Sequence, residues 1–378
     1  MSELLSFLKN HQKEMEDTLL RLVEAESPSN NKVLADQCGV VLQKEFEALI
    51  GGSVEVVPQE NVGNQYCFTY GTGEETEQIL IIGHYDTVWN EGALPIKKED
   101  GLLYGPGTFD MKGGLTTTLW ALKALKEFGI TGKKKIVFFV SSDEEIGSNY
   151  SRQRIEEEAI KSTIVYVPES SISPDAAVKT ARKGVGWFTI SVTGITGHAG
   201  IDPWSGVSAI DELALQMVDI KKLASKEEGI SINVGMVLGG SRPNVIAKSA
   251  SAEIDVRITT REQAEEVERK ILDRAPFLDG TTVEVTGGIN RYPLERDDKV
   301  VELYEQLKEI AACHGYDLKE GSSGGASDGN FTAGLGIPTI DGLGPQGDGA
   351  HADHEHVVLT NLPYRAALLA EALKLNMK

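Results

Sequence analysis

Cysteine is scarce in this sequence, which holds only Cys38, Cys67 and Cys313 among its 378 residues. The number is odd, the three positions lie far apart, and no Cys-x-x-Cys pair occurs. These features argue against a disulfide framework and against a zinc site built from cysteine. We therefore expect three free thiols, each buried in the interior.

Long apolar runs are also missing. No segment approaches the roughly 20 consecutive apolar residues that a membrane-spanning helix requires. Residues 1–29 carry charges throughout and lack the uninterrupted apolar stretch of a signal peptide. The sequence therefore predicts a cytoplasmic protein that does not use a membrane as a partner.

Positive charge is the third deficiency, because 37 Lys and Arg stand against 57 Asp and Glu, giving a formal net charge of −20. Such a surface repels nucleic acid and anionic membranes, so neither is an expected partner. The hydrophobic content of 40% and charged content of 25% are typical of a globular protein. A chain of this length exceeds one ordinary core and predicts two domains.

Short apolar runs that alternate with helical segments predict a sheet covered on both faces by helices. The predicted strands of this first domain cover residues 77–83, 134–142, 162–170 and 337–344. Apolar positions at helical spacing predict helices over about residues 3–26, 113–128, 297–315 and 361–376. We expect an α/β domain whose sheet is mixed but largely parallel.

The pattern changes between about Val178 and Arg291, where strands and helices follow in the order β-α-β-β-α-β. This order is that of ferredoxin-like α+β domains. We therefore predict a catalytic domain formed by residues 1–178 and 292–378, interrupted by an inserted ferredoxin-like domain of residues 179–291.

Side chains that bind metals follow the predicted strands of the first domain. They are His84, Glu144, Glu145 and Glu169, with His351 in a loop after the last strand and Asp110 on a glycine-rich turn that leads into a helix. Because ligands bind at the carboxyl ends of parallel strands, we expect these side chains to converge. Two histidines and several carboxylates suit Zn²⁺, with Co²⁺ or Mn²⁺ as substitutes. Five ligands exceed the need of one open zinc and fit two metals that share a bridging carboxylate.

The segment Ser141–Ser148, SSDEEIGS, places three carboxylates in a row directly after a buried strand. A solvated turn is the alternative explanation for such a triplet, and each of the other motifs alone has a similar explanation as a surface loop or helix cap. Neighbouring residues of an extended chain point to opposite sides. Of Glu144 and Glu145, one can therefore bind metal while the other faces the substrate as a base.

Seven motifs occur in a fixed order: HYDTVW, GPGTFDMKGG, SSDEEIGS, VPES, TGHAG, GGASD and HADHE. In this order they resemble the zinc peptidase and amidohydrolase family of glutamate carboxypeptidase, acetylornithine deacetylase, succinyl-diaminopimelate desuccinylase, aminoacylase and bacterial tripeptidases. The resemblance extends from about Ser27 to the last helix and is greatest to glutamate carboxypeptidase.

The resemblance implies a role for each ligand. His84 and Glu169 would hold one metal, Glu145 and His351 would hold the other, and Asp110 would bridge the two.

It also implies roles around the metals. Glu144 would be the general base, Asp86 would fix the tautomer of the imidazole at His84, and the peptide bond Asp110–Met111 would be cis. Glu355, four residues after His351, fits a residue that orients a ligand. His354 and His356 receive no role.

The inserted domain would act as a lid and would form a homodimer. His198 in TGHAG resembles the lid histidine that reaches the partner subunit's site and stabilises the oxyanion. Asn244, Arg257 and Arg291 resemble residues that contact carboxylate or carbonyl groups of the substrate.

The expected reaction is hydrolysis of a small peptide or N-acyl amino acid with a free carboxylate. A glutamate carboxypeptidase-like metallopeptidase is the first interpretation and an N-acyl amino acid deacylase is the alternative. A non-catalytic relative used for partner binding is a third, which the presence of Glu144 and all five ligands disfavours.

Overall fold

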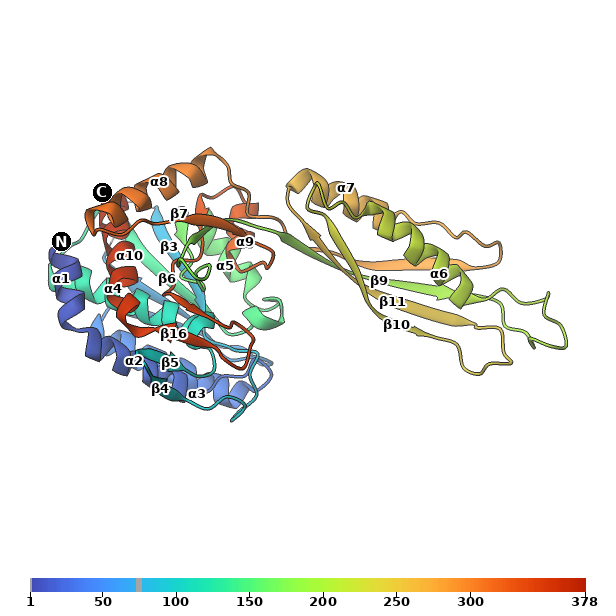
Figure 1. The fold of residues 1–378 in the computed structure, drawn as a ribbon, viewed down its shortest axis with the longest axis horizontal. Helices are drawn as coiled ribbons and strands as arrows, with labels where there is room; N and C mark the ends of the chain where they lie inside the picture. The colour runs from blue at the N-terminus through green and yellow to red at the C-terminus, as the bar shows by residue number, and fades with distance from the viewer. Residues whose placement is uncertain (1, 73–76) are drawn as a thin grey trace. The chain divides into compact units, whose positions relative to one another are not determined.

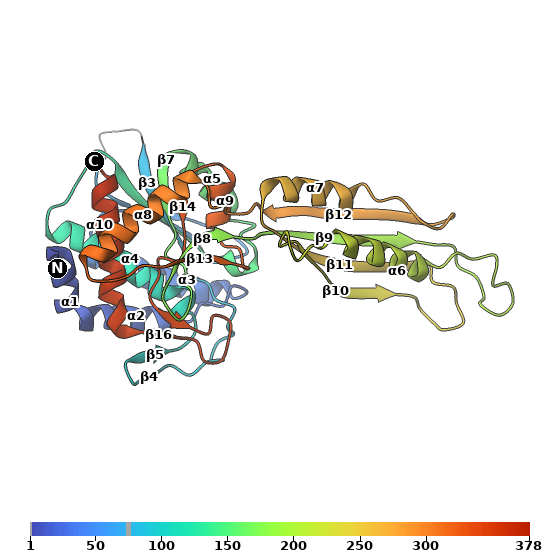
Figure 2. The same ribbon diagram turned by 45° about the horizontal axis from the view of Figure 1, so that its top comes forward.

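A computed structural model describes residues 2–72 and 77–378 of the chain. The chain forms two compact units, each drawn in Figures 1 and 2. The first unit comprises Met1–Ala181, Arg296–Ser323 and Ser327–Lys378, and the second comprises Arg182–Glu295 and Gly324–Ala326. The second unit begins and ends slightly C-terminal to the insert expected from the sequence.

The first unit is built on a six-stranded sheet with the strand order β1-β2-β6-β3-β7-β14. Strands β6, β3, β7 and β14 run parallel, while β1 and β2 are antiparallel to their neighbours. The prediction of a mixed, largely parallel sheet is confirmed. The strands are β1 (Ser53–Val57), β2 (Gln65–Tyr70), β3 (Gln78–His84), β6 (Lys135–Ser141), β7 (Ser162–Tyr166) and β14 (Thr339–Ile340).

Helices cover both faces of this sheet, as the run of apolar residues in β3 requires. Ile79 and Ile81 pack into the larger core cluster, and Leu80 and Ile82 pack into a smaller cluster on the opposite face. Helices α5 (Arg152–Ile160) and α9 (Gly329–Gly334) contribute to the smaller cluster. The helices that contribute to the larger cluster are α1 (Glu3–Asn10), α2 (Gln12–Glu24), α3 (Lys32–Leu49), α4 (Gly113–Glu127), α8 (Asp298–Cys313) and α10 (Leu362–Asn376).

Two smaller sheets complete the first unit. One has the order β15-β16-β5-β4 and the other pairs β13 with β8. The larger of them joins segments that are distant in the sequence, because His356 pairs with Tyr104. The strands are β4 (Lys97–Glu99), β5 (Leu102–Tyr104), β8 (Val178–Arg182), β13 (Glu320–Ser323), β15 (Gly347–Asp348) and β16 (His356–Val358).

The structure corrects two expectations about local structure. The predicted helix over residues 3–26 is two helices, because α1 ends at Asn10. The next residue, His11, has a non-helical backbone, and its ring nitrogen Nδ1 binds the carbonyl of Phe7. Cys38 and Cys67 are buried thiols as expected, but Cys313 is exposed, since it lies at the end of α8 beyond the last core position, Ala311. None of the helices in the described part of the chain has the length and apolar content needed to cross a bilayer.

The second unit is a four-stranded antiparallel sheet with the order β10-β11-β9-β12 and two helices on one face. Chain order and strand order together are those of a ferredoxin-like domain, which confirms the expected fold class. Alternate residues of β9 are buried against α6 and α7, while the remaining positions lie on the open face. The elements are β9 (Gly184–Thr193), α6 (Ala209–Ile220), β10 (Ser231–Gly239), β11 (Ser249–Ile258), α7 (Arg261–Leu272) and β12 (Thr282–Arg291).

Candidate metal centre

Three neighbouring parallel strands of the large sheet deliver candidate ligands to one edge. His84 is the last residue of β3, Glu145 lies in the turn after β6, and Glu169 follows β7 by three residues. Because β3 lies between β6 and β7 in the sheet, the three side chains start from adjacent strand ends. This is the position at which α/β sheets bind ligands.

Asp110 reaches the same place from the turn Thr108–Lys112, which leads into α4. Gly107 precedes this turn in the left-handed backbone region, at φ 72°. A Cβ atom there would lie 2.6 Å from Cγ2 of Thr87 and 3.2 Å from the carbonyl oxygen of Asp110, so only glycine fits. The peptide bond Asp110–Met111 is cis, as the resemblance implied.

His351 comes from the loop between β15 and β16 rather than directly from the last strand of the large sheet. Its backbone is also left-handed, at φ 61°, and its side chain is 52% exposed. The small sheet that pairs β16 with β5 therefore carries this histidine to the rim.

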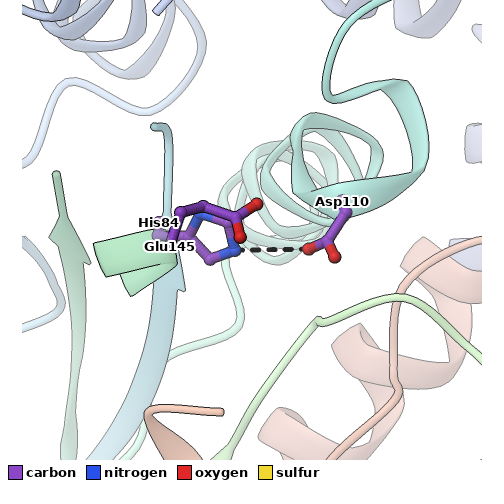
Figure 3. Close-up of side chains that lie close together, drawn as sticks. All are labelled: His84, Asp110 and Glu145. Carbon is purple, nitrogen blue, oxygen red and sulfur yellow. Dashed lines mark ion pairs between the residues drawn. The ribbon is translucent and has the colours of Figure 1, made fainter. Parts of the chain in front are cut away.

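The structure brings all five predicted ligands together. His84, Asp110 and Glu145 each offer a ligand atom within 4.8 Å of the others (Figure 3). Nε2 of His84 lies 3.3 Å from Oδ1 of Asp110 and 3.2 Å from Oε1 of Glu169. Nε2 of His351 lies 3.0 Å from Oε2 of Glu145 and 3.6 Å from Oδ2 of Asp110. The two oxygens of Asp110 thus face two different imidazoles.

The donor set fits a pair of divalent cations. Nε2 of His84 and Oδ1 of Asp110 are buried, and neither makes a hydrogen bond to any of the described residues. Buried polar atoms rarely lack a partner, so an unfilled pair of this kind points to a ligand. The carboxylates of Asp110, Glu145 and Glu169 together carry negative charge that cations neutralise.

The electrostatics reflect the crowding of these groups. Burial alone would lower the pKa of His84, but the carboxylates of Asp110, Asp86 and Glu169 outweigh burial and raise it well above its usual range. Burial raises the pKa of Glu145 to about 7, although His351 opposes this shift. The carboxylate of Glu145 in turn raises the pKa of His351 to about 9. Protons and metal ions therefore compete for the same atoms.

The tautomer of His84 is set by its own strand end. Nδ1 lies 3.0 Å from the backbone carbonyl oxygen of Asp86 and 3.4 Å from Oδ1 of the same residue, so Nδ1 donates and Nε2 faces Asp110 and Glu169. The acceptor nearest to Nδ1 of His84 is thus the backbone carbonyl oxygen of Asp86, and the ordered motifs did not indicate this.

Glu144 and Glu145 do not lie in an extended chain, so that part of the prediction is wrong. They form a single 3₁₀ turn, Glu144–Ile146, which is closed by a hydrogen bond from the N–H of Gly147 to the carbonyl of Glu144 at 2.9 Å. With three residues per turn, neighbouring side chains still diverge by about 120°. Glu145 approaches His351, and Glu144 lies beside it, half-buried.

In the second unit, the structure brings together His198, the predicted oxyanion donor, and Asn244, a predicted substrate contact. His198 and Asn244 are both exposed, and their loops pair through a hydrogen bond from the N–H of Ala199 to the carbonyl of Asn244 at 3.1 Å. Nδ1 of His198 accepts hydrogen bonds from the N–H groups of Gly200 and Ile201, each at 3.1 Å. The neutral ring therefore carries its proton on Nε2 and can donate it to a ligand.

The two predicted substrate arginines lie on the same level of the second unit's sheet. Arg257 of β11 and Arg291 of β12 both pair with Val185 of β9, which lies between them. Asp255 holds Arg257 in a two-pronged ion pair, with Nε–Oδ1 at 2.8 Å and Nη2–Oδ2 at 2.9 Å. Strand register thus places two arginines that are distant in the sequence at the same level of the sheet.

Sequence reasoning missed two supporting residues. Ser29 donates a hydrogen bond from its hydroxyl to Oδ2 of Asp86 at 2.7 Å, and no local pattern distinguishes it from other loop serines. Asp255 could have been found, because residues two apart in a strand share a face and opposite charges there pair. His354 and His356 remain without a role, and the ring of His356 packs against the ring of Tyr104.

Known proteins support this description. The sequence model that represents peptidase family M20/M25/M40 matches residues 80–375 of this chain. Carboxypeptidase G2 from a Pseudomonas species is 30% identical over 315 residues, which cover 80% of this chain and 74% of that protein.

Two solved structures share the fold. Aminopeptidase PepT from Bacillus cereus has a TM-score of 0.77 at 24% identity, and the match covers 96% of this chain and 98% of that one. The Bacillus subtilis YxeP protein, described as a dinuclear metal-binding peptidase, has a TM-score of 0.71 at 16% identity and covers 97% and 98%. The resemblance of the ordered motifs is therefore confirmed, and the chain belongs to peptidase family M20/M25/M40, a family of zinc peptidases and amidohydrolases.

Proposed function

We propose that this peptidase-family protein is a di-zinc hydrolase that cleaves an amide or peptide bond next to a carboxylate-bearing residue, as a glutamate carboxypeptidase does. The observation that carries the proposal is the position of Asp110, whose Oδ1 lies 3.3 Å from His84 Nε2 and whose Oδ2 lies 3.6 Å from His351 Nε2. One carboxylate between two imidazoles is the arrangement that two metals sharing a ligand require.

The proposed ligands divide into two sets. His84 and Glu169 would hold one metal, Glu145 and His351 would hold the other, and Asp110 would serve both. A pair of divalent metals supplies the Lewis acid that polarises an amide carbonyl and acidifies water. The identity of the metal is proposed as Zn²⁺, with Co²⁺ or Mn²⁺ as substitutes, because nitrogen and carboxylate ligands suit all three.

Glu144 is the proposed general base. It would take a proton from the attacking water and return it to the leaving amine. Its backbone N–H donates to Oδ1 of Asp86 at 3.3 Å, which supports a fixed position beside Glu145. The division of labour between the two glutamates follows from this, since Glu145 already approaches His351.

His198 is the proposed donor to the oxyanion that forms at the carbonyl oxygen. Its Nδ1 accepts two backbone N–H groups, so a donor N–H remains at Nε2. A preorganised donor of this kind stabilises developing negative charge. We further propose that residues 179–291 form a lid that makes a homodimer in the cytoplasm and that His198 serves the partner's site.

The substrate carboxylate is proposed to bind Arg257 and Arg291, with Asn244 contacting a carbonyl or carboxylate oxygen. The shared pairing of both arginines with Val185 supports this, because two guanidinium groups on one level can hold one carboxylate. Asp255, two residues earlier on the same strand, holds the guanidinium of Arg257 in a two-pronged ion pair.

A substrate screen tests the proposal. The protein is loaded with Zn²⁺ or Co²⁺ and assayed on dipeptides, N-acyl amino acids, and folyl- or acyl-glutamates. Cleavage of a peptide or folyl bond next to a carboxylate supports the carboxypeptidase assignment, whereas turnover confined to N-acyl amino acids identifies a deacylase. No turnover of any amide by protein that carries two metals contradicts the proposed function.

A further inference from the structure

Glu355 is a buried carboxylate that the proposed reaction does not use. Its side chain is 1% exposed and lies at the end of the loop that carries His351, just before β16. The backbone around it is held on both sides, because its N–H donates to the carbonyl of Ala352 at 2.9 Å and its carbonyl accepts from the N–H of Gly105 at 3.4 Å. The main chain of Glu355 is therefore anchored on both sides.

Four N–H groups converge on this one carboxylate. Oε1 accepts from the backbone N–H of Phe109 at 2.9 Å and of Asp110 at 3.0 Å. Oε2 accepts from the backbone N–H of Gly107 at 3.1 Å and from the indole of Trp89 at 2.7 Å. Two of these four donors, Phe109 and Asp110, belong to the turn that presents Asp110, and a third, Gly107, directly precedes it.

Glu355 therefore joins two segments that each supply a metal ligand. Asp110 lies 245 residues before Glu355 in the chain, and His351 lies four residues before it. A displacement of the His351 loop would move Glu355, which would in turn move the N–H groups that hold the Asp110 turn. The carboxylate acts on the main chain of the turn, and Asp110 remains the ligand.

We propose that Glu355 is a positioning residue that holds the Asp110 turn against the His351 loop and so makes the two metal positions interdependent. This inference rests on the proposed two-metal function. It assigns to Glu355 the task of keeping both oxygens of Asp110 directed at different imidazoles.

The pairing of donors makes Glu355→Gln a sharp test. An amide has one acceptor oxygen and one NH₂ group, which can only donate. Each oxygen of Glu355 receives two N–H groups, so either orientation of the amide sets its NH₂ against two donors. The variant keeps the size of the side chain and loses the hold on the turn.

A matched control lies in the second unit. Glu212 of α6 is also a buried carboxylate, and it accepts backbone N–H groups from Phe277 at 3.0 Å and Leu278 at 2.7 Å. The variant Glu212→Gln therefore disturbs a similar set of hydrogen bonds, but in the unit that supplies none of the proposed metal ligands.

The experiment is a calorimetric titration of metal-free protein with Zn²⁺ and with Co²⁺, with the visible spectrum of the Co²⁺ form as a second readout. We expect the wild type and Glu212→Gln each to bind two equivalents of metal. In Glu355→Gln we expect affinity for both equivalents to fall about 10–100-fold, as for other residues that support metal ligands, and the Co²⁺ spectrum to change. Thermal unfolding of the metal-free wild type and of the two metal-free variants shows whether each variant is folded.

The outcomes separate the inference from the proposed function. A wild-type protein that binds no pair of metals contradicts the proposed function, and the inference falls with it. A wild-type protein with two tight equivalents and an equally tight Glu355→Gln variant overturns the inference alone. If Glu355→Gln does not fold, Glu355→Asp replaces it, because the shorter aspartate side chain cannot reach both donor pairs. A Glu355→Asp variant that binds both metals with wild-type affinity overturns the inference.

Discussion

The carboxylate of Asp86 accepts a hydrogen bond from the backbone N–H of Glu144, with 3.3 Å between Oδ1 and the nitrogen. Its other oxygen accepts from the N–H of Glu145 at 3.3 Å and from the hydroxyl of Ser29 at 2.7 Å. Asp86 is fully buried and lies two residues after His84. One side chain thus ties the turn after β6 to the end of β3, so the proposed base and the imidazole keep a fixed spacing.

Replacing Asp86 should therefore disturb the metal centre without removing a ligand. In Asp86→Asn, the NH₂ group faces one of the backbone N–H donors, which loosens the turn of Glu144 and Glu145. We expect metal affinity to fall about 10–100-fold, measured by titration of metal-free protein. The control is Asp36→Asn, because Asp36 also accepts a backbone N–H, that of Asn64 at 2.7 Å, and holds no ligand. Equal losses in both variants would contradict the role given to Asp86.

Asp110 should be needed for both metals. The wild-type protein should retain about two equivalents of Zn²⁺ or Co²⁺ after reconstitution and dialysis, because a two-metal mechanism requires them. Asp110→Asn should retain clearly less than one equivalent of metal, because the amide lacks the negative charge that both metal positions share. Metal analysis by mass spectrometry measures both numbers. A firm single equivalent in the wild type would rule out the bridging role.

The two adjacent glutamates should fail in different ways. Glu144→Gln should lower turnover by at least 10²–10⁴-fold, the usual effect of removing a general base, with metal content nearly intact. Glu145→Gln should lose metal, because Glu145 contacts His351 at 3.0 Å. Activity and metal content are measured on the same samples. If both variants lost metal equally, the proposed division of labour would be wrong.

Mixed dimers test the proposed role of His198. His198→Ala should lower turnover about 10²–10³-fold, the effect of losing one oxyanion donor elsewhere. When this variant is mixed with Glu144→Gln, each mixed dimer should contain one site with both residues intact, so activity should partly return. Co-purification of differently tagged subunits shows that they exchange. Exchange without any return of activity would falsify the shared site.

The second unit should lose stability in acid through Glu212. Burial alone would raise the pKa of Glu212, but hydrogen bonds from Gln216 and from the N–H groups of Phe277 and Leu278 outweigh it and lower the pKa below its ordinary value of 4.5. Because the folded pKa is the lower one, this stabilisation is present above 4.5 and is lost as the pH falls through the folded pKa. Glu212→Gln should therefore be less stable than the wild type at about pH 7, and the gap should narrow at about pH 4. Urea unfolding at both pH values measures the gap, and a gap that widens in acid would contradict the assignment.

The sequence by itself determined the architecture and the kind of chemistry. Apolar runs and helical spacing are local patterns, so the order of residues alone predicts the parallel strands, the ferredoxin-like insert and the polar residues at strand ends. The ordered motifs identified the family in the same way. Even the cis bond at Asp110–Met111 followed from the resemblance.

Only the tertiary structure decided how the site is held. Glu144 and Glu145 occupy a 3₁₀ turn in which Asp86, from the loop after β3, accepts their backbone N–H groups. Arg257 and Arg291 share one level because strand register, which spacing cannot give, pairs both with Val185. The two oxygens of Asp110 face two histidines that come from distant segments. Such partners are set by packing and register across the whole unit, whereas local patterns specify only the element in which each residue lies.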